Sequence, residues 1–246
     1  MTILVVTGTG TGVGKTVVTA AIAALAMTAG SRVAVVKPVQ TGATRDEPAD
    51  LAEVERLAAP TSVIELARYP DPLAPAAAAR LAGLPFIDLA RCADRIRSLT
   101  DDHELVLVEG AGGLLVPFDV SGGTLADLTR ALAAPAVLVA DPALGTLNHT
   151  ALTLEALSSR GIECAGVVLG SWPARADLAC RANLADLETL VGRPLAGALT
   201  QGIGRLRRSE FADAARSGLA PTFGGQFDAA DFRRMHDPRP RGPQQN

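Results

Sequence analysis

The sequence predicts an α/β fold: a single doubly wound domain with a mostly parallel central sheet and helices on both faces. Short apolar runs rich in β-branched residues alternate with segments of helical spacing along most of the chain, which is typical of parallel strands joined by crossover helices. Hydrophobic residues make up 48% of the 246 residues and aromatic ones only 3%. The core must therefore consist of Val, Leu, Ile and Ala, which suits helices packed on a parallel sheet.

The expected strands are short apolar runs of the kind that is buried on both faces of a sheet. They cover residues 2–7, 32–36, 105–108, 136–140 and 165–169. The first helix runs from about Lys15 to Gly30, a natural residue just past a helix end. Further helices are expected at 48–59, 75–82, 86–99, 125–132, 148–159 and 177–191. Ligands of such sheets bind beyond the carboxyl ends of the strands, and the motifs described below all follow strands.

Residues 1–224 are predicted to form one catalytic domain. The pattern fades in a C-terminal extension, residues 225–246, which is rich in Pro, Arg and Gln from about residue 237 and is expected to be disordered from there on. A net charge of −3 without a basic stripe argues against nucleic acid as a partner.

Three cysteines without C-x-x-C spacing, Cys92, Cys164 and Cys180, fit a reducing cytosol better than a disulfide framework or a structural zinc site. No basic leader precedes the first strand, and the apolar run at 16–29 is too short to span a membrane. We therefore expect a cytoplasmic protein without a signal peptide and without a membrane partner.

A Gly- and Thr-rich loop with the sequence GTGTGVGKT, residues 8–16, joins the first strand to the first helix. Backbone N–H groups of such a P-loop cradle phosphates, and the helix N-terminus adds a favourable dipole. Lys15 should reach the β- and γ-phosphates, and the Thr16 hydroxyl should ligate Mg²⁺. Thr9 replaces the first glycine of the common pattern, which indicates a subfamily of P-loop NTPases. Partition and division-site ATPases carry a lysine at the place of Gly10, so a dimerising switch of that class is disfavoured.

Two further strand ends carry charged residues. Lys37 follows the second strand, where a lysine can stabilise a transferring phosphoryl group or an anionic nucleophile, although an ordinary surface lysine is the alternative. Glu109 ends an apolar strand in the position of a Walker-B acid that binds Mg²⁺, with a loop-capping carboxylate as the alternative. Asp50 opens a helix, where N-capping and metal binding are both open interpretations.

Four sequence blocks together resemble the motif set of dethiobiotin synthetases, in order and in spacing: residues 7–16, 37–42, 108–113 and 145–150. Each block alone is shared more widely, and the resemblance covers about residues 1–200. It implies an ATP-dependent cyclo-ligase of biotin biosynthesis, which converts 7,8-diaminononanoate and CO₂ into dethiobiotin. The implied route runs through a carbamate and a carbamic–phosphoric anhydride, and it releases nucleoside diphosphate and phosphate.

The resemblance also implies roles for individual residues. It implies that Lys37 and Lys15 are catalytic and that Thr16, Asp50 and Glu109 bind Mg²⁺, directly or through water. Nucleotide contacts are implied for Gly12, Val13, Gly14, Lys15, Thr16, Val17, Asp50, Glu109, Gly110, Ala111, Gly112, Gly170, Ser171, Thr200, Gln201 and Gly202. Substrate contacts are implied for Thr11, Lys37, Thr41, Gly112, Gly113, Gly145, Thr146, Leu147 and Asn148. The last four are implied to reach the substrate of a partner subunit in a homodimer, where a helix start offers free N–H donors to a carboxylate.

The chain departs from the family at the base-recognition site. Many relatives have an Asn-Asp-type pair where this chain has Gly170-Ser171-Trp172. An Asn side chain can read adenine, and a glycine or a serine cannot reproduce this, so we expect ATP or another nucleoside triphosphate to be accepted. Trp172 either stacks near the base or packs beneath the loop. We expect His103 and His236 at the surface, and His149 at a helix surface or an interface.

Two rival functions fit less well. A related amide-forming ligase, such as a cobyrinate amidating enzyme, would need a glutaminase domain with a nucleophilic cysteine, for which this chain has no room. A nucleotide switch of the partition type would need the missing loop lysine and a basic or amphipathic surface.

Overall fold

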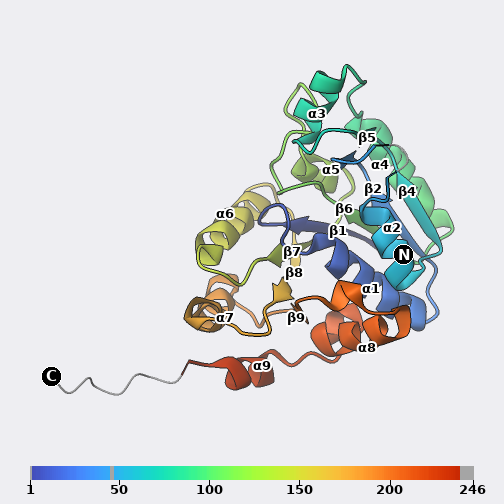
Figure 1. Cartoon of the computed structure of the whole chain (residues 1–246). Coiled ribbons are helices and arrows are strands. Elements are labelled where there is room, and N and C mark those ends of the chain that lie inside the picture. Colours follow the sequence, from blue (N-terminus) through green and yellow to red (C-terminus); the bar gives the residue numbers. More distant parts are fainter. Residues whose placement is uncertain (1, 45–46, 239–246) are drawn as a thin grey trace, which may run out of the picture.

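A seven-stranded sheet forms the centre of the molecule (Figure 1). The computed structural model describes residues 2–44 and 47–238. The strand order is β4-β2-β6-β1-β7-β8-β9, and all neighbouring strands are parallel. The strands are β1 (Thr2–Gly8), β2 (Val33–Lys37), β4 (Ser62–Glu65), β6 (Leu105–Glu109), β7 (Ala136–Ala140), β8 (Cys164–Trp172) and β9 (Gly197–Thr200). The predicted α/β class is confirmed.

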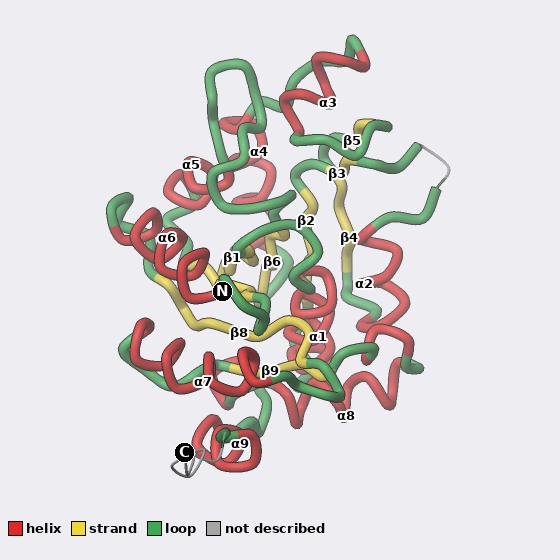
Figure 2. The backbone as a smooth tube through the Cα atoms, turned by 60° about the vertical axis from the view of Figure 1, so that its left-hand side comes forward, coloured by secondary structure: helices red, strands yellow, loops and turns green. Residues whose placement is uncertain are grey.

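Helices cover both faces of this sheet (Figure 2). Those of the described residues are α1 (Lys15–Thr28), α2 (Asp50–Ala58), α3 (Pro75–Ala82), α4 (Leu89–Ser98), α5 (Leu125–Ala131), α6 (Thr146–Ser158), α7 (Leu178–Val191), α8 (Arg208–Gly218) and α9 (Ala229–His236). Short 3₁₀ turns lie at Leu99–Asp101, Ile203–Arg205 and Pro221–Phe223. A separate two-stranded ribbon pairs β3 (Gln40–Thr41) with β5 (Arg68–Tyr69).

The alternation of side chains along β1 explains why the sheet has two hydrophobic cores. Leu4 and Val6 point to the face that is covered by α1, α2 and α8, whereas Val5 points to the face that is covered by α4 and α5. A third cluster lies between β7, β8 and helices α6, α7 and α9. Since successive strand residues face opposite sides, a strand covered on both faces has to be apolar throughout.

Several elements were not predicted. Strand β4 is only half-buried along its length, β9 has four residues and begins with a glycine, and α8 carries four charged residues in its eleven. Gly197 at the start of β9 packs on the backbone of α8: an added Cβ there would lie 2.6 Å from the carbonyl oxygen of Gly218. Such contacts come from distant parts of the chain, so a local pattern cannot reveal these edge elements.

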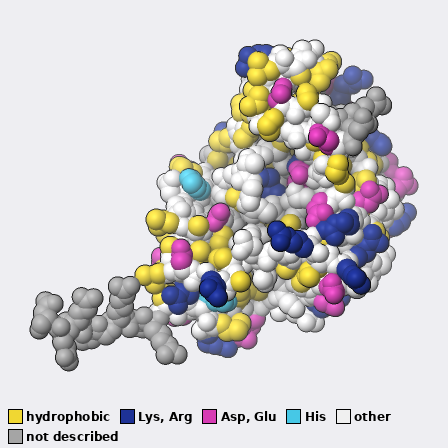
Figure 3. Space-filling model, viewed as in Figure 1, with side chains coloured by type: hydrophobic (Ala, Val, Ile, Leu, Met, Phe, Trp, Pro, Cys, Tyr) yellow, Lys and Arg dark blue, Asp and Glu magenta, His cyan; other side chains and the backbone are white. Residues whose placement is uncertain are grey.

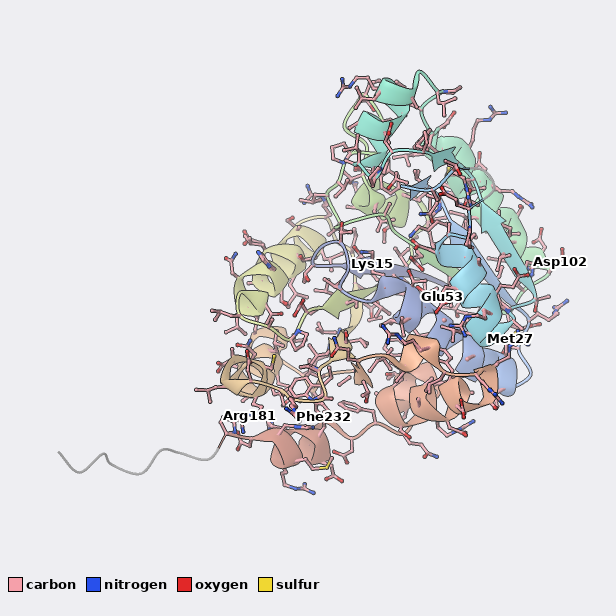
Figure 4. The ribbon with its side chains drawn as sticks, viewed as in Figure 1. Lys15, Met27, Glu53, Asp102, Arg181 and Phe232 are labelled. Atoms are coloured by element: carbon pink, nitrogen blue, oxygen red, sulfur yellow. The ribbon has the colours of Figure 1, made fainter. Side chains whose placement is uncertain are left out.

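The C-terminal extension contains helix α9. Asp228 caps its first turn by accepting a hydrogen bond from the N–H of Asp231, and Arg233 pairs with Glu188 of α7. Phe232, labelled in Figure 4, packs edge-on against Trp172 at a centroid distance of 5.1 Å. Most of the tail that we expected to be disordered, residues 239–246, lies outside the described part of the chain.

Charged side chains of both signs are mixed over α1, α2 and α8 on the face shown in Figure 3, as in the ion pair of Arg56 with Glu53. Hydrophobic side chains gather over α3 at the top of the same view, including Leu81 and Leu84. Among the described residues, no helix combines the length and the hydropathy that a membrane crossing needs.

The expectation for His103 is wrong. Its side chain is buried, with 7% exposed. It follows the 3₁₀ turn Leu99–Asp101, and its Nδ1 lies 2.9 Å from the carbonyl oxygen of Leu99. Nε2 lies 3.0 Å from the hydroxyl of Ser62 on β4. Because both ring nitrogens have partners, burial of this imidazole carries little penalty.

Candidate active site

A cavity of about 670 Å³ opens at the carboxyl ends of β1, β2 and β6. It is lined by the P-loop and the start of α1, the segment after β2, the start of α2, residues 72–75 and the loop after β6. Predicted site residues among the lining are Thr11, Gly12, Gly14, Lys15, Thr16, Val17, Lys37, Thr41, Asp50, Glu109, Gly110, Ala111 and Gly112. Segments far apart in the sequence thus meet at one edge of the sheet.

The P-loop has the backbone that its glycines allow. Gly12 has φ of 77° and Gly14 has φ of 97°, both in the left-handed region that favours glycine. Gly14 is the N-cap residue of α1, so the free N–H groups of the first turn face the cavity edge. Lys15, labelled in Figure 4, begins α1, and its Nζ donates a 2.7 Å hydrogen bond to the carbonyl oxygen of Gly10. Burial and then the nearby charge of Lys37 lower the pKa of Lys15 to about 8.

Lys37 is the centre of an ionic cluster in which Lys37 and Glu109 are buried and Asp50 is partly exposed. Its Nζ lies 2.5 Å from Oδ2 of Asp50 and 2.7 Å from Oε1 of Glu109, and it donates a 3.3 Å hydrogen bond to the carbonyl oxygen of Gly110. The side chain is 3% exposed. Burial alone would lower the pKa of Lys37, but the charges of Glu109 and Asp50 outweigh this and raise it. The carboxylates of Glu109 and Asp50 therefore favour the charged form of Lys37.

Glu109 links this cluster to the P-loop helix. Its Oε1 also accepts a 2.9 Å hydrogen bond from the Thr16 hydroxyl. Its Oε2 is buried and has no hydrogen-bond partner among the described residues, although a buried carboxylate oxygen normally has one. Asp50 is the first residue of α2 after the N-cap residue Ala49, and no side-chain cap bond forms there. The helix-capping alternative for Asp50 thus has no support, since its carboxylate pairs with Lys37 instead.

These residues fit a hard divalent cation only in part. A hydroxyl and two carboxylates are the oxygen donors that Mg²⁺ prefers, and Oε2 of Glu109 is free to bind one. Within residues 2–44 and 47–238, however, no group of three or more His, Cys, Asp or Glu side chains could hold a metal. A cation here would need phosphate or water oxygens in addition, as Mg²⁺ sites of nucleotide enzymes commonly do.

Glycines after β6 bring the backbone close to the P-loop. A Cβ at Gly110 would lie 2.3 Å from Cδ2 of Leu125, so this position has no room for a side chain. Gly112 has φ of 72°, and its Cβ position is 3.7 Å from the Thr11 hydroxyl. Gly113 follows outside the cavity lining.

The predicted base-recognition residues lie outside the cavity lining as well. Gly170 and Ser171 belong to β8, which extends three residues beyond the predicted strand. Val13 of the P-loop is buried, and its carbonyl oxygen would be only 2.0 Å from a Cβ at Gly170. The loop after β9, predicted as Thr200, Gln201 and Gly202, is tied to β8 by a 2.7 Å hydrogen bond from the Gln201 N–H to the Trp172 carbonyl.

Trp172 packs beneath this loop. It is 5% exposed and belongs to the cluster between β8, α7 and α9. Its ring contacts Phe232 and His236, with centroids 5.1 Å and 4.9 Å away. Of the two interpretations for Trp172, the structure therefore supports packing beneath the loop.

The segment from Gly145 to Asn148 forms the start of α6, outside the cavity lining. Gly145 is the N-cap residue with φ of 98°, and Leu144 before it is 88% exposed. Asn148 and His149 are also exposed, whereas Thr146 is buried and Leu147 half-buried, so only part of this helix start faces outward.

Part of the cavity wall was not predicted from the sequence. Pro72, Leu73, Ala74 and Pro75 also line the cavity, and a Cβ at Gly42 would be 3.0 Å from Cβ of Pro72. The paired prolines of the segment DPLAP were the available signal, since prolines fix a turn that can approach a glycine closely.

Comparisons with known proteins identify relatives of this chain. A family model described as an AAA domain matches residues 2–202. ATP-dependent dethiobiotin synthetase BioD from Frankia casuarinae is 60% identical, with 96% of this chain and 100% of that protein covered. The same-named protein from Saccharopolyspora erythraea is 59% identical, with 92% and 99% covered.

Solved structures show a likeness in fold alone. The septum site-determining protein MinD with Mg-ADP from Pyrococcus horikoshii has a TM-score of 0.54 at 16% identity, and the match covers 96% of this chain and 94% of that one. The sequence identity to the synthetases is far higher and extends over nearly the whole length of both chains. This chain belongs to the family of ATP-dependent dethiobiotin synthetases.

Proposed function

We propose that this protein is a dethiobiotin synthetase, which uses ATP to join 7,8-diaminononanoate and CO₂ and to close a cyclic urea. The observation that carries the proposal is the buried Lys37 ammonium, held between Asp50 and Glu109 beside the P-loop. This arrangement brings a fixed positive charge to the place where a γ-phosphoryl group and an anionic acceptor would meet.

The reaction needs no covalent enzyme nucleophile. One substrate amine forms an N–C bond to CO₂ and loses a proton, which gives a carbamate. A carbamate oxygen then attacks the γ-phosphorus, and the bond between this phosphorus and the β–γ bridging oxygen breaks, which gives a carbamic–phosphoric anhydride and ADP. The second amine attacks the carbamoyl carbon, loses a proton and expels phosphate as the ring closes. Positioning and electrostatic stabilisation would supply the rate.

Lys37 and Lys15 divide the charge stabilisation between them. Lys37 would neutralise the carbamate and the phosphoryl group during transfer. Lys15 would leave the carbonyl of Gly10, its partner here, for the β- and γ-phosphates. The sequence contains these two lysines and no others, so every side-chain ammonium group of the protein lines this cavity.

Thr16, Asp50 and Glu109 would hold Mg²⁺, directly or through water. The support is the chemistry of their oxygens and the unpartnered Oε2 of Glu109. Bound Mg²⁺ would offset the charge of the phosphates. Thr11 and Thr41 line the same cavity with hydroxyl groups and would contact the substrate or its carbamate.

The remaining contacts belong to the same proposal. Nucleotide phosphates would lie against the P-loop and the loop after β6, and the base near Gly170-Ser171 and the loop at 200–202. Because Gly170 has no side chain and Trp172 is buried, we propose relaxed base selectivity with ATP as one of the accepted triphosphates.

A homodimer completes the proposed site. The partly outward-facing start of α6, from Gly145 to Asn148, would supply free N–H donors to the carboxylate of the substrate bound by the partner subunit. Exposed Leu144 and Leu152 next to it supply apolar surface for such a contact. Residues 1–224 would form the catalytic domain, and the three unpaired cysteines fit the reducing cytoplasm.

The proposal is tested by phosphate release that depends on both the diamine and bicarbonate, with the product identified by mass spectrometry. We expect one phosphate for each dethiobiotin formed and no ring closure when either substrate is omitted. Phosphate release without any cyclic urea in the presence of all substrates would reject the function. Lys37→Ala is the control variant, and it should lose turnover.

A further inference from the structure

We propose that Lys37 is an internal substitute for the divalent cation in the ligand-free protein. Its ammonium occupies the space between Asp50 and Glu109, so that the site has little affinity for free Mg²⁺ until a nucleotide arrives. This inference rests on the proposed function, because it concerns the metal site of that reaction. It adds a binding order and a second role for Lys37.

The contacts of the ammonium resemble those of a bound cation. All its donors face oxygen atoms: Oδ2 of Asp50 at 2.5 Å, Oε1 of Glu109 at 2.7 Å and the carbonyl of Gly110 at 3.3 Å. An ammonium group has three N–H donors, so each one has a partner. Two of these three oxygens belong to the carboxylates that would bind the metal.

The charges in the cavity are already balanced. Among the described residues that line it, Lys15 and Lys37 are the cations and Asp50 and Glu109 are the anions. Both salt bridges of this cavity in residues 2–44 and 47–238 belong to Lys37. A free divalent cation would therefore add two uncompensated charges next to a buried ammonium, and such charges repel strongly away from bulk water.

A nucleoside triphosphate reverses this balance. It brings several negative charges to the P-loop, and Lys37 has a flexible four-carbon stem that can carry its ammonium from the carboxylates towards the γ-phosphate. The carboxylates that it leaves then need a new positive partner. The metal would accordingly enter with the nucleotide or after it, and Lys37 would reach its catalytic position in the same exchange.

Lys37→Met separates this role from an ordinary structural one. Methionine has a similar length and no charge, so the variant keeps the two carboxylates and removes the ammonium between them. Since an unpaired buried carboxylate is costly, the empty site should now accept a cation. We expect Mn²⁺ to bind Lys37→Met at least about tenfold more tightly than the wild type in the absence of nucleotide, which corresponds to about 1.4 kcal/mol.

The full chain is titrated with Mn²⁺ alone, and the concentration of free Mn²⁺ is measured by electron paramagnetic resonance. The matched control is Lys15→Met, which removes the other cavity charge but leaves both salt bridges intact, and should gain much less Mn²⁺ affinity than Lys37→Met. A second control, Lys37→Met combined with Glu109→Gln, should lose the gain. Equal Mn²⁺ affinity of Lys37→Met and the wild type would overturn the inference, while the substrate-dependent assay of the wild type would still decide the proposed function.

A measurement on the wild type covers the case in which Lys37→Met fails to fold. Protein with ¹³C-labelled lysine gives two Cε signals, because the sequence has only two lysines, and Lys15→Met assigns them. Addition of Mg²⁺ alone should leave the Lys37 signal unchanged, and ATP with Mg²⁺ should shift it. A shift of the Lys37 signal at sub-millimolar Mg²⁺ without nucleotide would overturn the inference.

Discussion

Gly170→Ala should displace the backbone of the P-loop. Gly170 lies in β8, directly under the loop: an alanine Cβ there would be 2.0 Å from the carbonyl oxygen of Val13 and 3.1 Å from Cα of Gly14. It would also lie 2.6 Å from a methyl group of Val139 on β7. The contact is reciprocal, because a Cβ at Gly14 would meet the Gly170 carbonyl oxygen at 2.6 Å.

The size of the effect follows from these distances. Real Cβ atoms essentially never approach closer than 3.0 Å, so the gap of 2.0 Å must open by at least 1.0 Å. Overpacking of this kind costs about 1–3 kcal/mol of unfolding free energy, which lowers Tm by several degrees. Displacement of the phosphate-binding groups by about 1 Å should also weaken catalysis by about 10²-fold.

The assay is calorimetric titration with ATP together with thermal unfolding by circular dichroism. Gly10→Ala is the matched control in the same loop, because nothing lies within 4 Å of its added Cβ and its φ is not in the left-handed region. We expect weaker ATP binding and a lower Tm for Gly170→Ala, and nearly unchanged values for Gly10→Ala. ATP affinity of Gly170→Ala equal to that of the wild type would refute the claim that β8 supports the phosphate-binding backbone.

Four further predictions concern charge, pH dependence, packing and base selectivity. Lys37→Ala should lower kcat by about 10²–10³-fold or more while the Kd for the nucleotide changes little; full turnover would remove Lys37 from the mechanism. Because the pKa of Lys15 is lowered to about 8, its ammonium is present below that pH and lost above it. ATP affinity should thus fall as pH rises from 7 to 9, and calorimetry in two buffers at pH 9 should detect proton uptake on binding; a constant affinity would contradict the assigned contact. Trp172→Ala should lower the unfolding free energy by about 3–5 kcal/mol, because the ring is buried against α9, and denaturant titration showing a loss below 1 kcal/mol would contradict this packing role. Phosphate release with CTP or GTP should approach that with ATP, and a strong preference for ATP would contradict relaxed selectivity at Gly170-Ser171.

The sequence alone determined the fold class and the segments that meet at the cavity. Strands buried on both faces must be apolar throughout, so β1, β6 and β7 are recognisable as short runs without any knowledge of their neighbours. Parallel strands bring their carboxyl ends to one edge. Residues that follow different strands, such as Lys15, Lys37 and Glu109, are therefore expected to lie close together, and in the structure they line one cavity.

Only the tertiary structure decided how these groups are paired and which residues have no room to change. Spacing along the chain cannot tell that Lys37 bridges Asp50 and Glu109, that Oε2 of Glu109 has no hydrogen-bond partner in the described part of the chain, or that Gly170 supports the P-loop. It also could not reveal the burial of His103 or the edge strand β9. The physical reason is the separation in sequence of the interacting residues. Strand and helix patterns arise from neighbouring residues, whereas ion pairs and backbone contacts join segments that come together only when the sheet has formed.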